Sequence, residues 1–344
     1  MSDTTATLRR KIDSAGDLQS VVRTMKTLAA SSIGQYEASV RALADYSGTV
    51  ELGLGACLRA PAPTAAVGTD EARPHVGVRS AVVFGSDQGL VGQFNERVAD
   101  HAVATLAALP GETHIWAVGE RVQARLVDAH MELAGAFAVP TSVKAITPLV
   151  GQILVESESR HGLDEESELY LLYNRPQSGS VYAPVSQRLL PLDAGWRRDL
   201  AARPWPTRSV PEIMGGRMAM LGALVHEYLF VSLFRACAES LASENASRLA
   251  AMQRADKNID ELLEKLNTAF QRVRQSGIDE ELFDVVAGFE ALAGRAHPTL
   301  SSETPRDASI PRHGPDRAPP WNAGSSRPTR RRRQPRGRPS PGIR

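Results

Sequence analysis

A glycine-rich turn in the middle of the chain has the composition of a loop that holds a phosphate. Residues 85–92 read GSDQGLVG, follow the apolar run SAVVF and precede a helical pattern. Backbone N–H groups at such strand-to-helix turns bind anions in nucleotide-binding proteins. This turn lacks the GK[ST] ending of a P-loop and the G-x-G-x-x-G spacing, and Asp87 would repel a phosphate. A tight turn without a cofactor is the better interpretation, built by Gly85, Asp87, Gly89, Gly92 and Asn95.

Other reactive residues form no catalytic set in the sequence. The eight histidines are scattered, and neither G-x-S-x-G nor H-E-x-x-H occurs. His226 has no second histidine four residues on, so we interpret it as a seam or surface residue. Cys57 and Cys237 have no other ligand at metal-binding spacing and are expected to be buried free thiols. The sequence therefore predicts no catalytic residue and no metal site.

The charges are distributed unevenly along the 344 residues. Residues 296–344 contain eleven arginines and three acidic residues, a balance of +8, so the rest of the chain carries −7. Ten of the 22 prolines also lie beyond residue 297, which predicts a disordered tail. The arginine run at 330–333 has no interleaved aromatic residue, and no specific nucleic-acid binding is expected. The sequence contains no run of eighteen apolar residues, so no transmembrane span is expected.

Two long amphipathic stretches dominate the ends of the chain. Apolar or small residues recur every three or four positions over residues 8–54 and again over about 211–293, without an interrupting proline. Such spacing is typical of a coiled-coil seam. Neither helix is stable alone, so each is expected to cover the other's stripe. Gly53 and Gly55 are expected to weaken the end of the first helix.

The region between the two helices alternates short apolar runs with helical patterns, which indicates a small domain with a largely parallel sheet. The predicted fold is α/β, a long antiparallel coiled coil with a Rossmann-like domain inserted between its helices. We divide the chain into a helix (1–58), a linker (59–79), the α/β domain (80–195), a connector (196–211), a second helix (212–293) and the tail (294–344).

Four motifs in this order resemble the γ subunit of F-type ATP synthases. They are LRRKIDS with TMKTLAAS near the start, GSDQGLVGQFN from residue 85, SENASRLAAM from 243, and RQSGIDEEL with AGFEAL from 274. The choices KIDSA and FGSDQG are more similar to the alternate, N-type branch, whose complexes are thought to pump sodium. After residue 31 this chain lacks the basic run that is usual in the family.

The resemblance implies a rotor shaft in the central stalk, present in one copy inside a ring of three α and three β subunits. The α/β domain would contact the ε subunit and the membrane c-ring, on the cytoplasmic face of a bacterial inner membrane. ATP chemistry would take place on β, so this chain would be no enzyme by itself. Contacts with the ring are implied for Arg23, Met25, Lys26, Arg274, Gln275 and Glu281.

Two other functions stay open from the sequence. A static coiled-coil adaptor with an α/β binding domain would form a stable homodimer and would not interact with ATPase subunits. A nucleotide-dependent enzyme using residues 85–92 would bind nucleotide through its α/β domain.

Overall fold

The computed structural model describes residues 4–59, 79–109, 111–161, 168–177, 180–209, 211–214 and 216–293. Within them the chain divides into a unit up to Leu282 and a second unit from Phe283 onward. The expected linker and the expected disordered tail fall almost wholly on residues 60–78 and 294–344, outside the described part.

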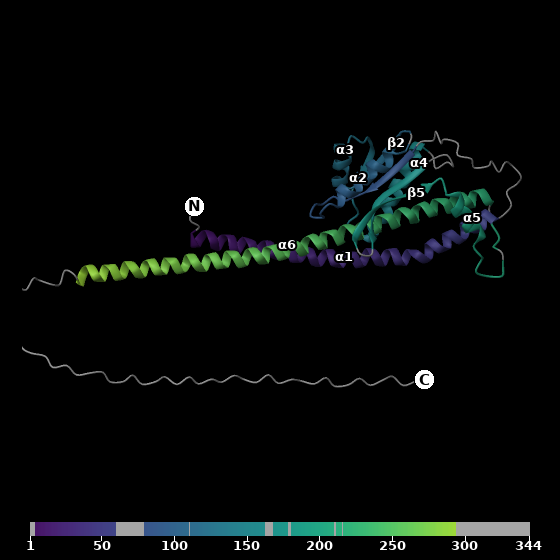
Figure 1. Ribbon diagram of the computed structural model, residues 1–344. Helices are drawn as coiled ribbons and strands as arrows, with labels where there is room; N and C mark the ends of the chain where they lie inside the picture. The colour runs from purple at the N-terminus through teal and green to yellow at the C-terminus, as the bar shows by residue number, and fades with distance from the viewer. Residues whose placement is uncertain are drawn as a thin grey trace, which may run out of the picture. The chain divides into compact units, whose positions relative to one another are not determined.

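Two helices run side by side in opposite directions, α1 (Thr5–Arg59, 55 residues) and α6 (Arg217–Ala293, 77 residues), as Figure 1 shows. Ala15 and Val22 of α1 share an apolar cluster with Met252 and Ile259 of α6. At the other end of α1, Val50 and Leu54 pack with Leu221 and Leu224. Rising numbers on α1 meet falling numbers on α6, so the predicted antiparallel coiled coil is confirmed.

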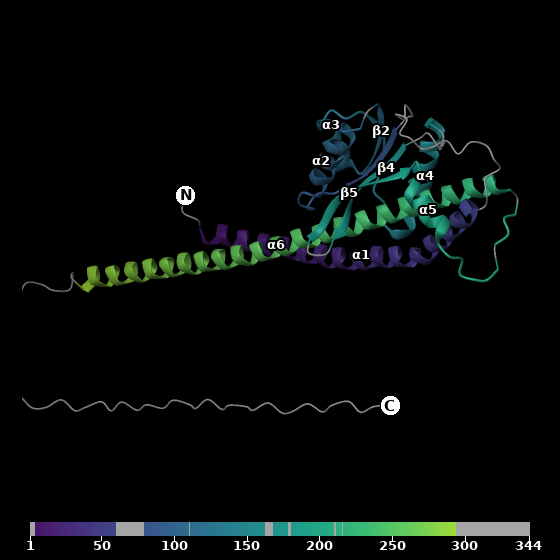
Figure 2. The ribbon, with the colours of Figure 1, turned by 45° about the vertical axis from the view of Figure 1, so that its right-hand side comes forward.

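A five-stranded sheet lies against the helix pair, with strand order β3-β2-β1-β4-β5 (Figure 2). Strands β1 (Arg79–Phe84), β2 (Thr113–Val118), β3 (Leu133–Phe137) and β4 (Glu168–Gln177) are parallel, and β5 (Ser180–Leu190) is antiparallel to β4. The parallel-dominated α/β fold is therefore confirmed. Strands β4 and β5 form a hairpin that extends through residues 174–177 and 180–185.

Helices cover both faces of this sheet. On one face, α2 (Phe94–Ala107) and α3 (Glu120–Asp128) bury residues such as Val98 and Val122 against β1 and β2. On the other face, α4 (Val143–His161) and α6 form a single apolar core with β1 and β4, to which α1 contributes Tyr36. Strand β1 is buried at every residue and is apolar from Ala81 to Phe84, as expected for a strand covered on both faces.

The segment 196–211, expected to be a connector, begins inside a helix. Helix α5 (Ala194–Ala202) starts after Asp193, whose carboxylate accepts a hydrogen bond of 2.8 Å from the backbone N–H of Trp196. A Cβ on Gly55 would lie 2.5 Å from the carbonyl oxygen of Leu200. Gly55 thus lets α5 approach α1 closely, and α1 continues past it to Arg59.

Among the described helices, α6 alone is long and apolar enough, by length and composition, to be considered for a membrane span. Its apolar residues between Leu229 and Ala242 are buried against the sheet, α4 and α1. We therefore attribute the apolar character of this stretch to the core of the α/β domain.

Replacing Gly85 by alanine is expected to lower the free energy of unfolding by about 1–3 kcal/mol, because overpacked cores are strained by this amount. The new Cβ would lie 2.3 Å from Cβ of Val122 and 2.8 Å from Oδ1 of Asn95. Urea unfolding followed by tryptophan fluorescence measures the change. The matched control is Gly151→Ala on α4, where no atom lies within 4 Å of the added methyl group. Equal stability of the two variants would contradict the packing argument.

Candidate functional site

In the turn at residues 85–92, the carboxylate of Asp87 forms hydrogen bonds with the backbone of two neighbouring segments. Asp87 accepts hydrogen bonds of 2.9 Å from the N–H of Glu120, at the start of α3, and from the N–H of Val139, after β3. N–H groups at a helix start are among those that bind a phosphate in nucleotide-binding loops. Asp87 thus ties the turn to the start of α3 and to the segment after β3, which favours a structural turn.

The other polar and glycine residues of this turn stabilise its backbone. Oδ1 of Asn95 accepts a 2.9 Å hydrogen bond from the N–H of Ser86, and Nδ2 donates to the hydroxyl of Ser86 at 2.8 Å. Gly92 has a φ of +60°, which favours glycine. A Cβ added to Gly89 would meet only Nη2 of Arg121, at 3.7 Å, an ordinary contact distance.

The same turn is attached to α6 at the motif that starts at residue 243. The buried hydroxyl of Ser247 donates to the carbonyl oxygen of Val91. Next to it on α6, Nη2 of the half-buried Arg248 lies 2.6 Å from Oε1 of the buried Glu244, beside Tyr36 of α1. Burial raises the pKa of Glu244, and Arg248 opposes that rise. This motif is therefore the place where α1, α6 and the turn meet.

A second attachment joins the sheet to α6 around Glu239. Its carboxylate accepts from the Tyr173 hydroxyl at 3.0 Å, from Nε of Arg175 at 3.0 Å and from Nε of Arg235 at 2.8 Å. The Arg175 guanidinium also lies 5.3 Å from the ring centre of Tyr173. Burial and the nearby Glu239 raise the pKa of Tyr173 to about 12. A carboxylate with three donors from two elements fixes where β4 sits along the helix.

A third polar cluster, which we call the clasp, joins α1 to α6 at Asp256. Nζ of Lys26 lies 3.0 Å from one carboxylate oxygen of Asp256, and Nε of Arg23 lies 3.2 Å from the other. Gln19 donates to both Asp256 and Asp260. The hydrogen bond from Lys26, followed by that from Arg23, holds the pKa of Asp256 below its ordinary value.

The structure places the predicted contact residues in two separate groups. Arg23 and Lys26 belong to the clasp. Met25 packs beside it against the apolar cluster that contains Met252. Arg274, Gln275 and Glu281 are exposed on α6, where Nε2 of Gln275 donates to Asp279 at 3.1 Å. Eighteen residues separate Asp256 from Arg274, about 27 Å along a helix. Contact with a partner ring stays a prediction for both groups.

The residues that form hydrogen bonds and ion pairs in these clusters were mostly not predicted from the sequence. Asp256 and Gln19 were not predicted as contact residues, because polar residues occur on most of the surface of both helices. Glu239 gave a usable signal, since it is a lone acid in the apolar stretch FRACAESLA. Its partners Tyr173 and Arg175 lie about 65 positions away on β4 and gave no such signal.

The histidine and the two cysteines considered for catalysis or metal binding lie in surroundings that favour structural roles. Nδ1 of His226 lies 3.2 Å from Glu158 of α4 at an exposed position. Cys57 and Cys237 are buried and free of disulfide bonds, as predicted, and burial raises the pKa of both thiols. In the described part of the chain, no cluster of three or more His, Cys, Asp or Glu side chains could hold a metal ion.

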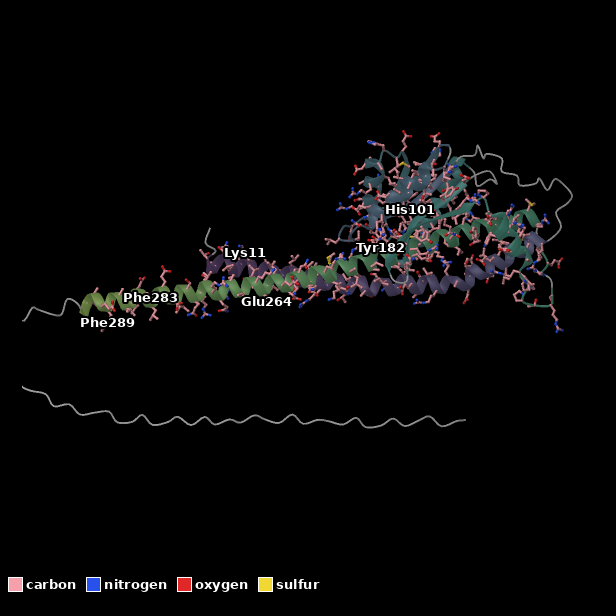
Figure 3. The ribbon with its side chains drawn as sticks, in the orientation of Figure 1. Lys11, His101, Tyr182, Glu264, Phe283 and Phe289 are labelled. Atoms are coloured by element: carbon pink, nitrogen blue, oxygen red, sulfur yellow. The ribbon has the colours of Figure 1, made fainter. Side chains whose placement is uncertain are left out.

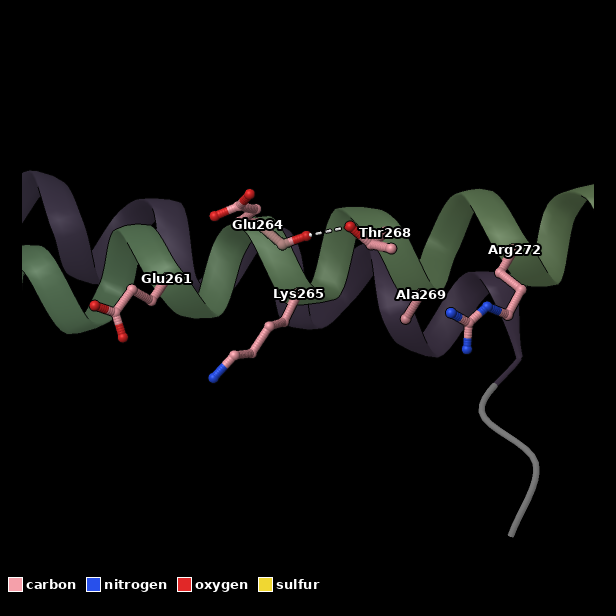
Figure 4. A pocket seen from close by; sticks show the side chains of 6 residues that line it. All are labelled: Glu261, Glu264, Lys265, Thr268, Ala269 and Arg272. Carbon is pink, nitrogen blue, oxygen red and sulfur yellow. Dashed lines mark hydrogen bonds between the residues drawn. The ribbon is translucent and has the colours of Figure 1, made fainter.

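Figure 4 shows the side chains along an open groove on α6. Their charged ends project from the helix, and the hydrogen bond drawn runs from the Thr268 hydroxyl to the carbonyl oxygen of Glu264 at 2.9 Å. The groove is an open helix face rather than an enclosed cavity in which a substrate would be desolvated. Its lining consists of Glu261, Glu264, Lys265, Thr268, Ala269 and Arg272.

Comparisons with known proteins agree with this arrangement. The sequence model of the ATP synthase family matches residues 4–292. The ATP synthase gamma chain of Syntrophus aciditrophicus is 28% identical over 301 residues, which cover 83% of this chain and 97% of the relative. The gamma chain of Moorella thermoacetica is 28% identical over 294 residues, covering 83% and 98%.

Two solved structures of the Euglena gracilis mitochondrial ATP synthase share the fold. A chain of its rotor in rotational state 1 matches with a TM-score of 0.51 and 13% identity, covering 80% of this chain and 98% of that one. A chain of its OSCP/F1/c-ring assembly in rotational state 3 matches with a TM-score of 0.56 and 14% identity, covering 87% and 98%.

Replacing Asp256 by asparagine is expected to lower the thermal unfolding midpoint of the full chain near pH 7, because the clasp loses its charge. A carboxylate with a lowered pKa stabilises the fold above its ordinary pKa of about 4, and this contribution disappears as the pH falls through the lowered value. The midpoints of variant and parent should therefore converge in acid. Unfolding midpoints measured from pH 7 down to strongly acidic buffer provide the check.

The matched control is Glu264→Gln, a neutralised carboxyl on the open side of the same helix (Figure 3). It should leave the midpoint nearly unchanged. A gap between Asp256→Asn and its parent that persists in acid would show that packing, and not the carboxylate charge, stabilises the clasp.

Proposed function

This chain belongs to the ATP synthase family, as the match over residues 4–292 shows, and we propose that it works as the central-stalk gamma subunit of a rotary F-type ATPase. The observation that carries the proposal is the antiparallel pair of α1 and α6, closed by an apolar seam and by the clasp. In this role the helix pair is a shaft that turns inside a ring of three α and three β subunits.

The two helices give the shaft unequal sides. Along α1, the surface carries the exposed apolar residues Leu18, Val21 and Leu28. Along α6, the side lined by Glu261, Lys265 and Arg272 is charged. Three identical neighbours around such a shaft meet three different surfaces, so they differ in conformational free energy and in nucleotide affinity.

Rotation then couples binding to movement. When the shaft turns by a third of a circle, each neighbour meets the surface that another one met before. Its affinity for nucleotide changes accordingly, and by thermodynamic linkage a change of bound nucleotide favours a new orientation of the shaft. The chain contributes positions and contacts to this cycle, and the phosphoryl chemistry belongs to the β subunits.

The α/β domain transmits the torque in this proposal. It would contact the ε subunit and the c-ring, and it is held on α6 at Glu239 and at Ser247, eight residues or about 12 Å apart along the helix. Two attachments resist twisting better than one. We infer that residues 1–58 and 212–293 form the shaft and residues 80–195 the domain at its foot.

We also infer where the subunit works. As part of the F1 sector it is attached peripherally to a membrane, and for a bacterial enzyme this is the cytoplasmic face of the inner membrane. The assignment to the N-type branch stays a prediction, and dependence of ATP-driven pumping on sodium by the purified complex would decide it.

Replacing Arg274 and Gln275 together by alanine is expected to weaken ATP-driven ion pumping or assembly about fivefold, which corresponds to the loss of interface contacts worth 1 kcal/mol. Both residues are exposed on α6. Nucleotide binding to β should be unchanged. The measurement compares pumping and nucleotide affinity in complexes assembled with parent and variant chains.

The matched control is Glu37→Ala with Arg41→Ala, which also removes two exposed polar side chains, in this case from α1. Normal ATP-driven pumping by the Arg274/Gln275 variant would contradict the proposed contact. Co-purification of the chain with α and β tests the function as a whole, whereas a stable homodimer that captures neither would favour a static adaptor.

A further inference from the structure

The last four turns of α6 carry an apolar stripe that the described part of the chain leaves uncovered. Phe283 and Phe289 project from this end of the helix (Figure 3), and each is 73% exposed. The stripe has spacings of four and three, which are typical of a helix that packs against a partner. Its members are Ile278, Leu282, Val285, Phe289 and Leu292.

The same end of α6 is strongly acidic. Between residues 275 and 294 there are five acidic residues and neither lysine nor arginine. The last turn of α6 contains no basic side chain. The carbonyl end of a helix has a partial negative charge, so carboxylates there destabilise it and cations stabilise it. The acidic residues are Asp279, Glu280, Glu281, Asp284 and Glu290.

The chain itself supplies cations immediately after this end. Residues 296–344 carry a balance of +8, with a run of four arginines at 330–333. The family match stops at residue 292, and the Syntrophus and Moorella relatives are covered over 97% and 98% of their lengths. The basic segment is therefore an addition to what those relatives have, and the shared function does not explain it.

We propose that the arginine-rich segment 294–344 folds back onto the acidic, apolar end of α6, residues 278–293, in the unassembled chain and shields it. Guanidinium groups bind carboxylates bidentately and stack on aromatic rings. The end of α6 offers both, as carboxylates interspersed with Phe283 and Phe289. Partner subunits would displace the segment when the complex assembles.

Chain length permits this contact. Residues 278–293 extend over about 22 Å of helix. A random-coil chain of 38 residues, the number from 293 to 330, has a root-mean-square reach of about 30–37 Å. The run at 330–333 is thus tethered close to its target at an effective concentration on the order of millimolar, which strengthens weak ionic contacts.

Other occupants fit the charges less well. A second copy of α6 would bring five further carboxylates beside the first five, and like charges repel. An anionic membrane or a nucleic acid could bind the arginines, but the acidic helix end next to them would weaken that binding. The contact in the unassembled chain does not depend on the proposed function, whereas its displacement on assembly rests on that function.

Hydrogen exchange of residues 278–293 in the full chain tests the proposal. Exchange should be about two- to fivefold faster in the variant R330S/R331S/R332S/R333S than in the parent, the factor expected for charges at a helix end. The difference should vanish in 1 M salt, where the Debye length falls to about 3 Å.

A double-mutant comparison keeps the result specific. In the background D284K/E290K the arginine substitutions should change exchange much less, because the net charge of residues 278–293 falls from −5 to −1. In the control background E261K/E264K, on the same helix outside this end, they should keep their effect.

Equal exchange in parent and R330S/R331S/R332S/R333S at low salt would overturn the proposal. So would protection that rises with protein concentration, which would identify a second copy as the occupant. Protection that requires added anionic vesicles or RNA would instead assign the arginines to an external polyanion.

Discussion

The long helix α6 depends on cover for its apolar side, and the structure as far as Leu266 follows from how this cover is achieved. Between Leu229 and Ala242 the cover is the face of the sheet with α4 and Tyr36 of α1. Around Met252 and Ile259 the cover is α1 alone. A helix of 77 residues has no intrinsic stability that would replace these contacts. The inserted domain and the first helix therefore cover successive stretches of α6.

Apolar seams alone do not fix how two helices are aligned, because a shift by one heptad still buries the stripe. The polar clusters supply that information. Asp256 finds donors on Gln19, Arg23 and Lys26 at one register only. Glu239 likewise fixes β4 through Tyr173 and Arg175. Breaking either set would leave carboxylates without donors in partly buried places, and this cost opposes sliding. A part that turns under load needs such fixed alignment.

Periodicity was sufficient to predict the seam, the parallel sheet and the antiparallel pairing, since each follows from local spacing and from chain connectivity. The partners of Glu239 and Asp256 were not predictable, because about 65 and 230 positions separate them from their donors. No sequence signal indicated the packing at Gly53 and Gly55, where a Cβ would crowd Leu224 or Leu200, because both neighbours lie far away in the chain. Helix α5 was missed because its nine residues depend on the cap from Asp193.

The turn at residues 85–92 shows why composition misleads about chemistry. Glycines are needed in phosphate loops so that the backbone can approach a ligand, and here they let the backbone approach the protein itself. A Cβ on Gly85 would collide with Val122, and one on Gly119, where φ is +116°, would lie 2.9 Å from the backbone of Ser86. Asp87 then bonds the N–H of Glu120, at a helix start of the kind that holds an anion in a nucleotide site. With the carboxylate built in, the turn becomes a rigid joint between sheet and helices, and Ser247 extends that joint to α6. The same geometry that would serve catalysis elsewhere serves rigidity here, which is what a domain that transmits torque requires.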